Sequence, residues 1–499
     1  MIKQESKNYA IMKRRLILWG VFALLSYLLC ILCSPSFSVW ANHNSQALDQ
    51  NVYHLIGRYW MEGDIPYKDF ADLKGPVLYL IYGIASLIAP CTFTGMTFFH
   101  AFIIGVGLLF AYESLKLFLP TKWACLAFLS YVSYSVPFGG NPSEYVWAMQ
   151  HIVYFFILRY LKEGSSAFLC HELILTGLFV GITCYLKYNL IICFFPACLL
   201  MLFCSRYKWH LSFLLLALGF LSIILPFLAY FYCTNSLADF AEEYFITSIR
   251  YGGIPFGQSA LCSSNITLLQ EFLPFKYENL PSPLLTVCGG IILILSIIPF
   301  LTPRTFKIKQ MGGFTHLSGL FLTFWVLYMG PYTWSHYAFS LHPFILTAFI
   351  AIFKFAEIKA NNKAILPVFT CAALCTFALM ATLFIHRSIK YSNQDGAANL
   401  AKVKSLVEAH NFITDGSAHI IMYRLTNTRP PVKHFVPQYI EGGIEKHQDE
   451  LHKYITTHKP AYLILNTSSS KLLIPRLRRE GHSYSPHSDF ENFQLYVRN

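Results

Sequence analysis

LSFLLLALGFLSIILPFLAYFYC, residues 211–233, contains no charged side chain. A transmembrane helix needs about 20 mainly apolar residues to cross the hydrocarbon core of a bilayer. Similar apolar runs recur as far as residue 386, and 55% of the 499 residues are hydrophobic while only 13% are charged. A soluble domain carries about 25% charged residues. The sequence therefore predicts a polytopic α-helical membrane protein and excludes a soluble enzyme, a disordered scaffold and a secreted disulfide-rich module.

Further apolar runs lie on both sides of this stretch. Residues 16–33 follow the basic triplet Lys13-Arg14-Arg15 but lack a cleavage site of small residues, so we expect an uncleaved span with a cytoplasmic N-terminus. The Cys30-x-x-Cys33 pair within this span predicts packing rather than a metal site, because no His or second Cys pair is near. The later runs are 76–90, 96–115, 123–137, 145–158, 168–186, 189–205, 211–233, 284–303, 314–331, 337–353 and 365–386.

The run 76–90 decides the topology, because it is short for a span. If it lies on the outer surface, the basic loops between the later runs all face the cytoplasm, as the positive-inside rule requires. The segments 138–144 and 331–336, which hold no Lys or Arg, then face outward. If it crosses, every basic loop faces outward. We therefore predict about eleven transmembrane helices plus one interfacial helix.

Residues 387–499 form a second, polar region with 15 of the 38 Lys and Arg residues and 10 of the 26 Asp and Glu residues. Alternating strand and helix patterns predict a small α/β domain with a partly parallel sheet. The expected helices are 393–410, 444–458 and 470–480, and the expected strands are 418–423, 461–466 and 493–497. The chain thus divides into a membrane body, residues 1–386, and an extracytoplasmic α/β domain, residues 387–499.

Polar residues that could perform chemistry are concentrated in the first outer loop, residues 34–95. A carboxylate at a membrane surface can act as a general base for a hydroxyl, and a neighbouring cation can hold a phosphate leaving group. The charges alone also fit a solvated loop that sets the register between helices. The loop contains Asp49, Arg58, Glu62, Asp64, Lys68, Asp69, Asp72 and Lys74.

Several short motifs occur in order along the outer segments. They are Asp49…Tyr53, Gly63…Pro66-Tyr67…Asp69, Asp72-Leu73-Lys74-Gly75-Pro76, Gly140-Asn141-Pro142-Ser143-Glu144, Lys187-Tyr188-Asn189, Trp334-Ser335-His336-Tyr337 and Lys459-Pro460-Ala461-Tyr462-Leu463-Ile464. As an ordered set they resemble the GT-C class of polyprenyl-phosphate-sugar-dependent glycosyltransferases. The resemblance is to the bacterial relatives of protein O-mannosyltransferases and of lipid A aminoarabinose transferases.

The resemblance implies a plasma-membrane enzyme that moves a sugar from a polyprenyl-phosphate carrier to an extracytoplasmic glycan, lipid or protein. No nucleic acid partner is expected. A divalent metal is less expected here, because Gln50 stands where many members have a second carboxylate. The implied roles are Asp49 as general base, Asp72 and Glu144 positioning acceptor or sugar, Lys74, Lys187 and His336 facing the lipid phosphate, and Tyr53, Tyr67 and Tyr337 binding substrate.

Each later motif also has a structural explanation. Glu144 can cap the helix that starts after Pro142, Lys187 can be a snorkelling residue at a span end, and His336-Tyr337 can anchor an interfacial aromatic belt. For the whole chain, the alternatives are a transporter or flippase of lipid-linked saccharides and a non-catalytic scaffold displaying its tail domain. A transporter keeps ionisable residues near the bilayer midplane. The predicted spans are nearly free of Asp and Glu, which favours the enzyme.

Overall fold

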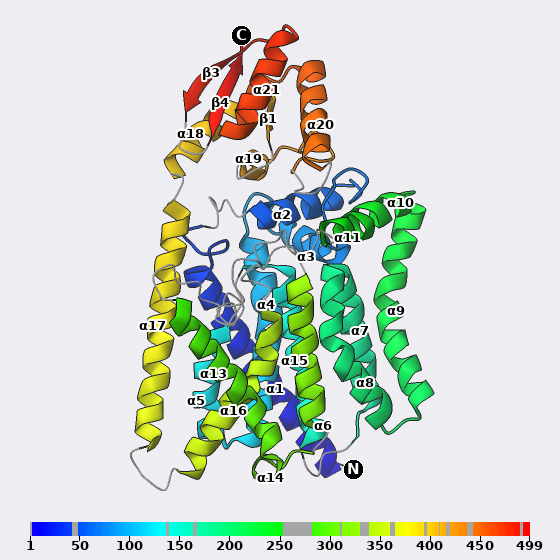
Figure 1. The fold of residues 1–499 in the computed structure, drawn as a ribbon, viewed down its shortest axis with the longest axis vertical. Coiled ribbons are helices and arrows are strands. Elements are labelled where there is room, and N and C mark those ends of the chain that lie inside the picture. The colour runs from blue at the N-terminus through cyan, green and yellow to red at the C-terminus, as the bar shows by residue number, and fades with distance from the viewer. Residues whose placement is uncertain are drawn as a thin grey trace. The chain divides into compact units, whose positions relative to one another are not determined.

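The computed structural model describes residues 2–41, 48–135, 139–162, 167–252, 282–309, 312–329, 339–359, 365–393, 397–408, 410–415, 420–436, 443–489 and 493–499. These residues form mainly helices and one small sheet (Figure 1). The chain separates into two compact units. Unit 1 contains Met1–Cys30, His100–Pro226 and Ile254–Phe384, and unit 2 contains Ile31–Phe99, Phe227–Gly253 and Ile385–Asn499.

Unit 1 is a helical bundle in which α13 packs against α16, and α16 against α5. Four of its helices, α1, α4, α9 and α17, continue beyond the boundaries of the unit. The elements are α1 (Ile2–Cys33), α4 (Thr94–Phe118), α5 (Thr121–Ser135), α6 (Pro142–Leu161), α7 (Cys170–Lys187), the 3₁₀ helix η1 (Tyr188–Phe194), α8 (Phe195–Cys204), α9 (Trp209–Cys233), α13 (Ser282–Leu301), α14 (Pro303–Phe306), α15 (Gly312–Met329), α16 (His342–Ile358) and α17 (Ile365–Asn393).

Six helical segments of the described chain are long and apolar enough to cross a membrane. Leucines along α9, including Leu218 at 56% and Leu225 at 55% exposure, face outward, as expected where lipid is the solvent. This composition and these lengths confirm a helical membrane protein, while the count of about eleven spans stays a prediction. The segments are Met12–Cys33, Thr94–Phe118, Cys170–Cys204, Trp209–Cys233, Phe339–Ile358 and Ile365–His386.

Unit 2 joins the first predicted outer loop to the C-terminal region. Its helices α2 and α3 cross where two glycines meet: a Cβ on Gly57 would lie 2.4 Å from the Tyr79 carbonyl oxygen. Gly83 has the same close contact with the Gly57 backbone, so both helices need glycine here. The helices of the unit are α2 (Leu48–Met61), α3 (Pro76–Ser86), α10 (Leu237–Phe240), the π-helix η2 (Ala241–Ile246), α11 (Thr247–Gly252), α18 (Ala397–Val407), α19 (Ile421–Leu425), α20 (Gly443–His458) and α21 (Thr467–Arg479).

The helix expected at 76–90 is α3, which has 11 residues. At 1.5 Å per residue it covers about 16 Å, roughly half the thickness of the hydrocarbon core. It is therefore too short to cross as a helix, in agreement with the sequence argument.

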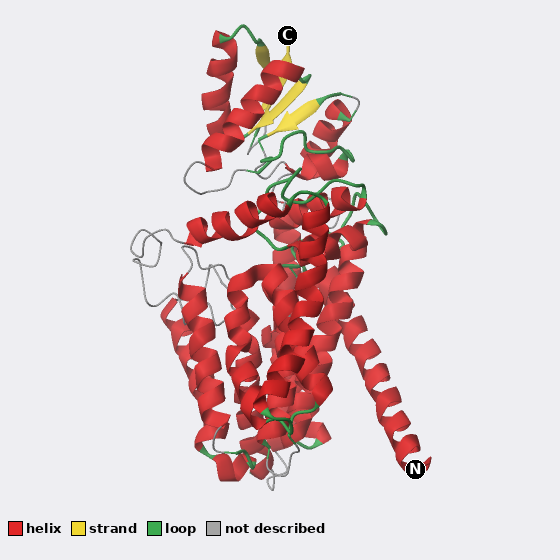
Figure 2. Cartoon of the chain, turned by 90° about the vertical axis from the view of Figure 1, so that its right-hand side faces the viewer, coloured by secondary structure: helices red, strands yellow, loops and turns green. Residues whose placement is uncertain are grey.

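The C-terminal sheet, drawn in yellow in Figure 2, has the strand order β1-β2-β4-β3. The strands are β1 (Phe412–Thr414), β2 (Tyr462–Leu465), β3 (Tyr484–Asp489) and β4 (Gln494–Arg498). β1 and β2 are parallel, with Phe412 opposite Tyr462, whereas the other two pairs are antiparallel. Alternate strand residues such as Leu463 and Leu465 pack against Leu451 and Ile455 of α20 and Leu473 and Leu477 of α21. The expected partly parallel sheet is thus present.

One expected strand is wrong. Residues 420–425 form a helical turn and α19 in place of the strand predicted at 418–423, and the strand next to β2 lies earlier, at Phe412–Thr414. Ile420, Ile421, Met422 and Tyr423 are all at most 1% exposed. A short run that is buried on every side has no period by which a strand and a helix can be told apart. The strands at 462–465 and 494–498 and the helices α20 and α21 agree with prediction.

Candidate functional site

Asp72 is a partly buried carboxylate at the end of the first loop, just before α3. The Tyr79 hydroxyl, one turn into α3, donates a hydrogen bond of 2.6 Å to Asp72 Oδ2. Burial raises the pKa of Asp72, and the charge of Asp49 raises it further, although Lys74 and the Tyr79 hydrogen bond act in the opposite direction. Asp49 therefore lies within electrostatic range of Asp72.

Asp49 lies in the first turn of α2, where the positive end of the helix dipole stabilises a carboxylate. Tyr53 is one turn further along the same face and only 1% exposed. Burial, followed by the charges of Asp49 and Asp72, raises the pKa of the Tyr53 hydroxyl well above its usual range. The tyrosine thus stays protonated between two carboxylates, with its ring 5.5 Å from that of Tyr82.

Lys74 completes this group. Its ammonium nitrogen lies 5.8 Å from the centroid of the Tyr53 ring, within the range of a cation–π contact. Unit 2 thus brings together four of the residues that the sequence selected: Asp49, Tyr53, Asp72 and Lys74. Tyr79, which the sequence analysis did not select, belongs to the same group through its bond to Asp72.

Tyr67 supports the loop rather than opening to solvent. It is fully buried, its backbone has a φ of 68°, and its hydroxyl donates to the Lys74 carbonyl oxygen at 2.7 Å. A positive φ is uncommon for a bulky residue and needs support from its surroundings. The support comes from rings of Tyr79, Phe231 and Phe240, which lie 5.2–5.9 Å from the Tyr67 ring. Tyr67 therefore fixes the backbone at Lys74.

The remaining sequence candidates belong to unit 1 or lie outside the described residues. Glu144 is 1% exposed near the start of α6, where its carboxylate accepts hydrogen bonds of 2.8 Å from the backbone of both Gly139 and Gly140. His100 Nε2 lies 3.7 Å from the same carboxylate. These contacts order the loop before α6, and the role of Glu144 stays a prediction. Lys187 ends α7, and His336 and Tyr337 lie outside the described part of the chain.

A group of C-terminal residues that the sequence analysis missed is bonded to this loop within unit 2. Arg424 is fully buried, donates to Asn51 Oδ1 and to the Cys91 carbonyl oxygen at 2.7 Å each, and lies 4.4 Å from the Phe93 ring centroid. Arg429 forms two hydrogen bonds to the Asp64 carboxylate, of 2.8 and 3.0 Å. The one sequence signal was an arginine inside the apolar run 420–425.

Lys433 and His434, which follow Arg429 in the same segment, form ion pairs with acidic residues of unit 2. Lys433 Nζ lies 2.9 Å from Asp239, and His434 lies 2.6 Å from Glu450 and 3.4 Å from Glu243. Burial lowers the pKa of His434, but hydrogen bonds to Glu243 and Glu450 outweigh it and raise the pKa to about 9. The same contacts hold the pKa of both glutamates below their usual value, against the effect of burial.

We expect this cluster to stabilise unit 2 only within a defined pH window. Since the pKa of His434 is raised, its contribution is complete below about pH 6.5 and is lost as pH rises through about 9. The lowered pKa of the two glutamates makes their contribution disappear as pH falls below 4.5. His434→Gln should lower the stability at pH 6.5 by about 1 kcal/mol, a usual value for a partly exposed ion pair. Thermal unfolding at pH 6.5 and 10 checks this, because the difference from wild type should vanish at pH 10; an equal difference at both values would contradict it.

The described residues of the candidate site offer few side chains that could bind a divalent metal. No group of three or more His, Cys, Asp or Glu side chains that could hold a metal occurs among the residues that the structure describes. Gln50, which replaces the second carboxylate of the resembled motif, is 6% exposed.

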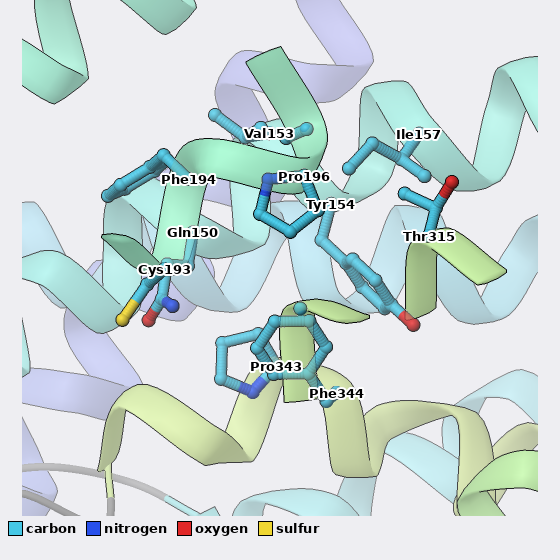
Figure 3. A pocket seen from close by; sticks show the side chains of 12 residues that line it. Gln150, Val153, Tyr154, Ile157, Cys193, Phe194, Pro196, Thr315, Pro343 and Phe344 are labelled. Carbon is cyan, nitrogen blue, oxygen red and sulfur yellow. The ribbon is translucent and has the colours of Figure 1, made fainter. Parts of the chain in front are cut away.

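A small cavity of about 30 Å³ lies within unit 1, between α6, the η1–α8 segment, α15 and α16 (Figure 3). Gln150, Tyr154 and Phe344 contribute to its lining, and Tyr154 donates to or accepts from His316 Nδ1 at 2.6 Å. This volume holds about two water molecules, which is too small for a sugar or a lipid headgroup.

Comparison with known proteins gives the class of fold. The chain has the GT-C fold that the order of its motifs implied, so this expectation is confirmed. It is similar to ArnT from Cupriavidus metallidurans bound to undecaprenyl phosphate, with a TM-score of 0.62, 12% identity and coverage of 97% of each chain. The apo state of that protein gives a TM-score of 0.63, with 10% identity and coverage of 98% of each chain.

A second similarity is to an archaeal protein, the oligosaccharyltransferase AglB from Archaeoglobus fulgidus in complex with an inhibitory peptide and a dolichol-phosphate. Its TM-score is 0.50 at 11% identity, covering 97% of this chain and 74% of that one. No protein-family model matches the sequence, and no curated protein matches it significantly. The similarity therefore lies in the fold rather than in the sequence.

Proposed function

We propose that the protein is an integral membrane glycosyltransferase that moves a sugar from a polyprenyl-phosphate carrier to an acceptor outside the cytoplasm. The observation that carries the proposal is the grouping of Asp49 and Asp72 around Tyr53, with Lys74 in the same loop. The fold supports it, because the similar ArnT and AglB structures hold undecaprenyl phosphate and a dolichol-phosphate.

In the proposed reaction, Asp49 accepts the proton of an acceptor hydroxyl while the hydroxyl oxygen attacks the anomeric carbon of the sugar. The bond between that carbon and the phosphate oxygen breaks, and its electron pair leaves with the polyprenyl phosphate. Lys74 stabilises the negative charge on that phosphate. Asp72, held by Tyr79, orients the acceptor or the sugar.

The proposal includes the predicted arrangement in the membrane. The N-terminus is cytoplasmic, the first loop and residues 387–499 lie outside, and α3 lies at the interface. Glu144, Lys187, His336 and Tyr337 belong to the outer side in this arrangement, where the last three would meet the donor lipid and Glu144 would order its own loop. This topology follows from the charge distribution.

The experiment is a transfer assay with purified protein, a panel of polyprenyl-phosphate sugars and membrane extract as the acceptor. Nucleotide sugars at the same concentration are the matched control, and we expect transfer from at least one lipid-linked donor and none from the nucleotide sugars. Movement of the donor between leaflets without transfer would instead support a flippase. Transfer from a nucleotide sugar alone would contradict the proposed donor class.

A further inference from the structure

The end of α6 and the segment after α13 are joined by backbone hydrogen bonds in unit 1. Lys162, immediately after α6, forms an antiparallel bridge with Ile308, and the Lys309 amide donates to the Leu161 carbonyl oxygen at 2.7 Å. The connection is short and needs Lys307 in a left-handed conformation, with a φ of 51°. Two loops that are distant in sequence are thus held together here.

The joined loops collect positive charge. Burial, followed by the positive charges of Lys354 and Lys307, lowers the pKa of Lys162, so both of these lysines lie within electrostatic range of Lys162. Lys309 Nζ is 3.7 Å from the centroid of the Tyr160 ring. Among the described residues at the ends of α6, α14 and α16, the acidic side chain is Glu357, whose carboxylate lies 2.7 Å from Lys354 Nζ. Among the described residues of these loops, the lysines therefore outnumber the acid that could neutralise them.

Apolar side chains lie beside these lysines. The Phe306 and Phe355 rings are 5.9 Å apart, and Phe355 is 40% exposed. Leu301 and Ile358, at the ends of α13 and α16, are 72% and 54% exposed. In a membrane protein such exposed apolar positions contact lipid chains. A ligand at this place would meet cations at one end and a lipid-facing apolar surface at the other.

We propose that Lys162, Lys307 and Lys354 form a binding site for the phosphate headgroup of an anionic phospholipid, whose chains run along the apolar ends of α13 and α16. The positive-inside rule puts these loops in the cytoplasm, where the anionic lipids of the inner leaflet attract basic clusters. The backbone bridge distinguishes this site from dispersed basic loops, because it holds the partly buried Lys162 close to the exposed Lys307, which is distant in sequence.

The test uses the full-length protein in a neutral detergent with added phosphatidylglycerol. We expect native mass spectrometry to show retained phosphatidylglycerol and thermal unfolding to shift upward with its concentration, because a ligand of the native state stabilises it. Phosphatidylcholine and inorganic phosphate serve as the comparison arms. Equal protection by phosphatidylcholine, or protection by inorganic phosphate alone, would overturn the proposal.

The variant Lys162→Gln/Lys307→Gln/Lys354→Gln should bind phosphatidylglycerol at least about tenfold more weakly, given the usual contribution of each lysine near a membrane surface. The matched control replaces three exposed lysines of unit 2, Lys402, Lys453 and Lys471, by glutamine and should bind as wild type does. If the first variant does not fold, the exposed Lys307→Gln alone and a triple arginine variant replace it. The arginine variant should retain binding of phosphatidylglycerol. Unchanged affinity in the Lys162→Gln/Lys307→Gln/Lys354→Gln variant, or in Lys307→Gln where that variant replaces it, would contradict the site.

Discussion

Asp49→Asn is expected to reduce sugar transfer by at least about 10²-fold, because the amide cannot accept the proton of the acceptor hydroxyl. The substitution keeps the shape of the side chain and leaves α2 intact, so the loss should be in kcat rather than in binding of the lipid donor. Donor binding by the purified variant and its thermal unfolding, measured beside transfer, separate a chemical defect from misfolding.

The control for this variant is Glu62→Gln, which removes a carboxylate just after the same helix. Glu62 accepts a hydrogen bond of 2.9 Å from Arg58 and is half exposed, so its loss should change transfer by less than about twofold. Equal transfer by wild type and Asp49→Asn would remove Asp49 from the mechanism. The general base would then be sought at Asp72, whose raised pKa brings it closer to neutrality.

The sequence predicted those parts of the fold that depend on local patterns. Apolar runs predicted the helices of the bundle, and the run after Pro76 predicted the short helix α3. Alternating patterns predicted β2 and β4 and the helices α20 and α21. In each case the residues along one segment carry the information, so no knowledge of distant partners was needed.

The arrangement of the candidate site depended on packing between segments. The sequence selected Asp49, Tyr53, Asp72 and Lys74 by their motif, but it could not show that Gly57 and Gly83 let α2 and α3 approach closely enough to bring two carboxylates to one tyrosine. Tyr79 was missed for the same reason. A tyrosine in an apolar helix is ordinary until its partner is known.

The contacts of the C-terminal segment were the least accessible from the sequence. Arg424 and its partner Asn51 are 373 residues apart, and neither is one of the residues that the motifs specify. The arginine also falls in the run where helix α19 was mistaken for a strand. Both errors have one cause: α19 is shaped by burial against α2 in unit 2, which overrides the local preference of its residues.

This burial leads to the second prediction of large effect. Arg424→Met is expected to lower the free energy of unfolding by about 2–4 kcal/mol, since the buried Asn51 Oδ1 and the partly buried Cys91 carbonyl oxygen each lose a charged donor. Asn51 lies on α2 between Asp49 and Tyr53, so a shift of this helix would also move the proposed base. We therefore expect transfer to fall about tenfold, because catalysis is sensitive to small displacements.

Thermal unfolding and transfer rates of three variants check this expectation. Arg478→Met removes an exposed arginine from α21 and should leave both quantities near the wild-type values. Arg424→Lys keeps a charge but can replace only part of the planar set of donors, so its stability should fall between those of Arg424→Met and wild type. Wild-type stability in Arg424→Met would show that the guanidinium contacts contribute little, whereas a stable variant with reduced transfer would assign Arg424 a positioning role through α2.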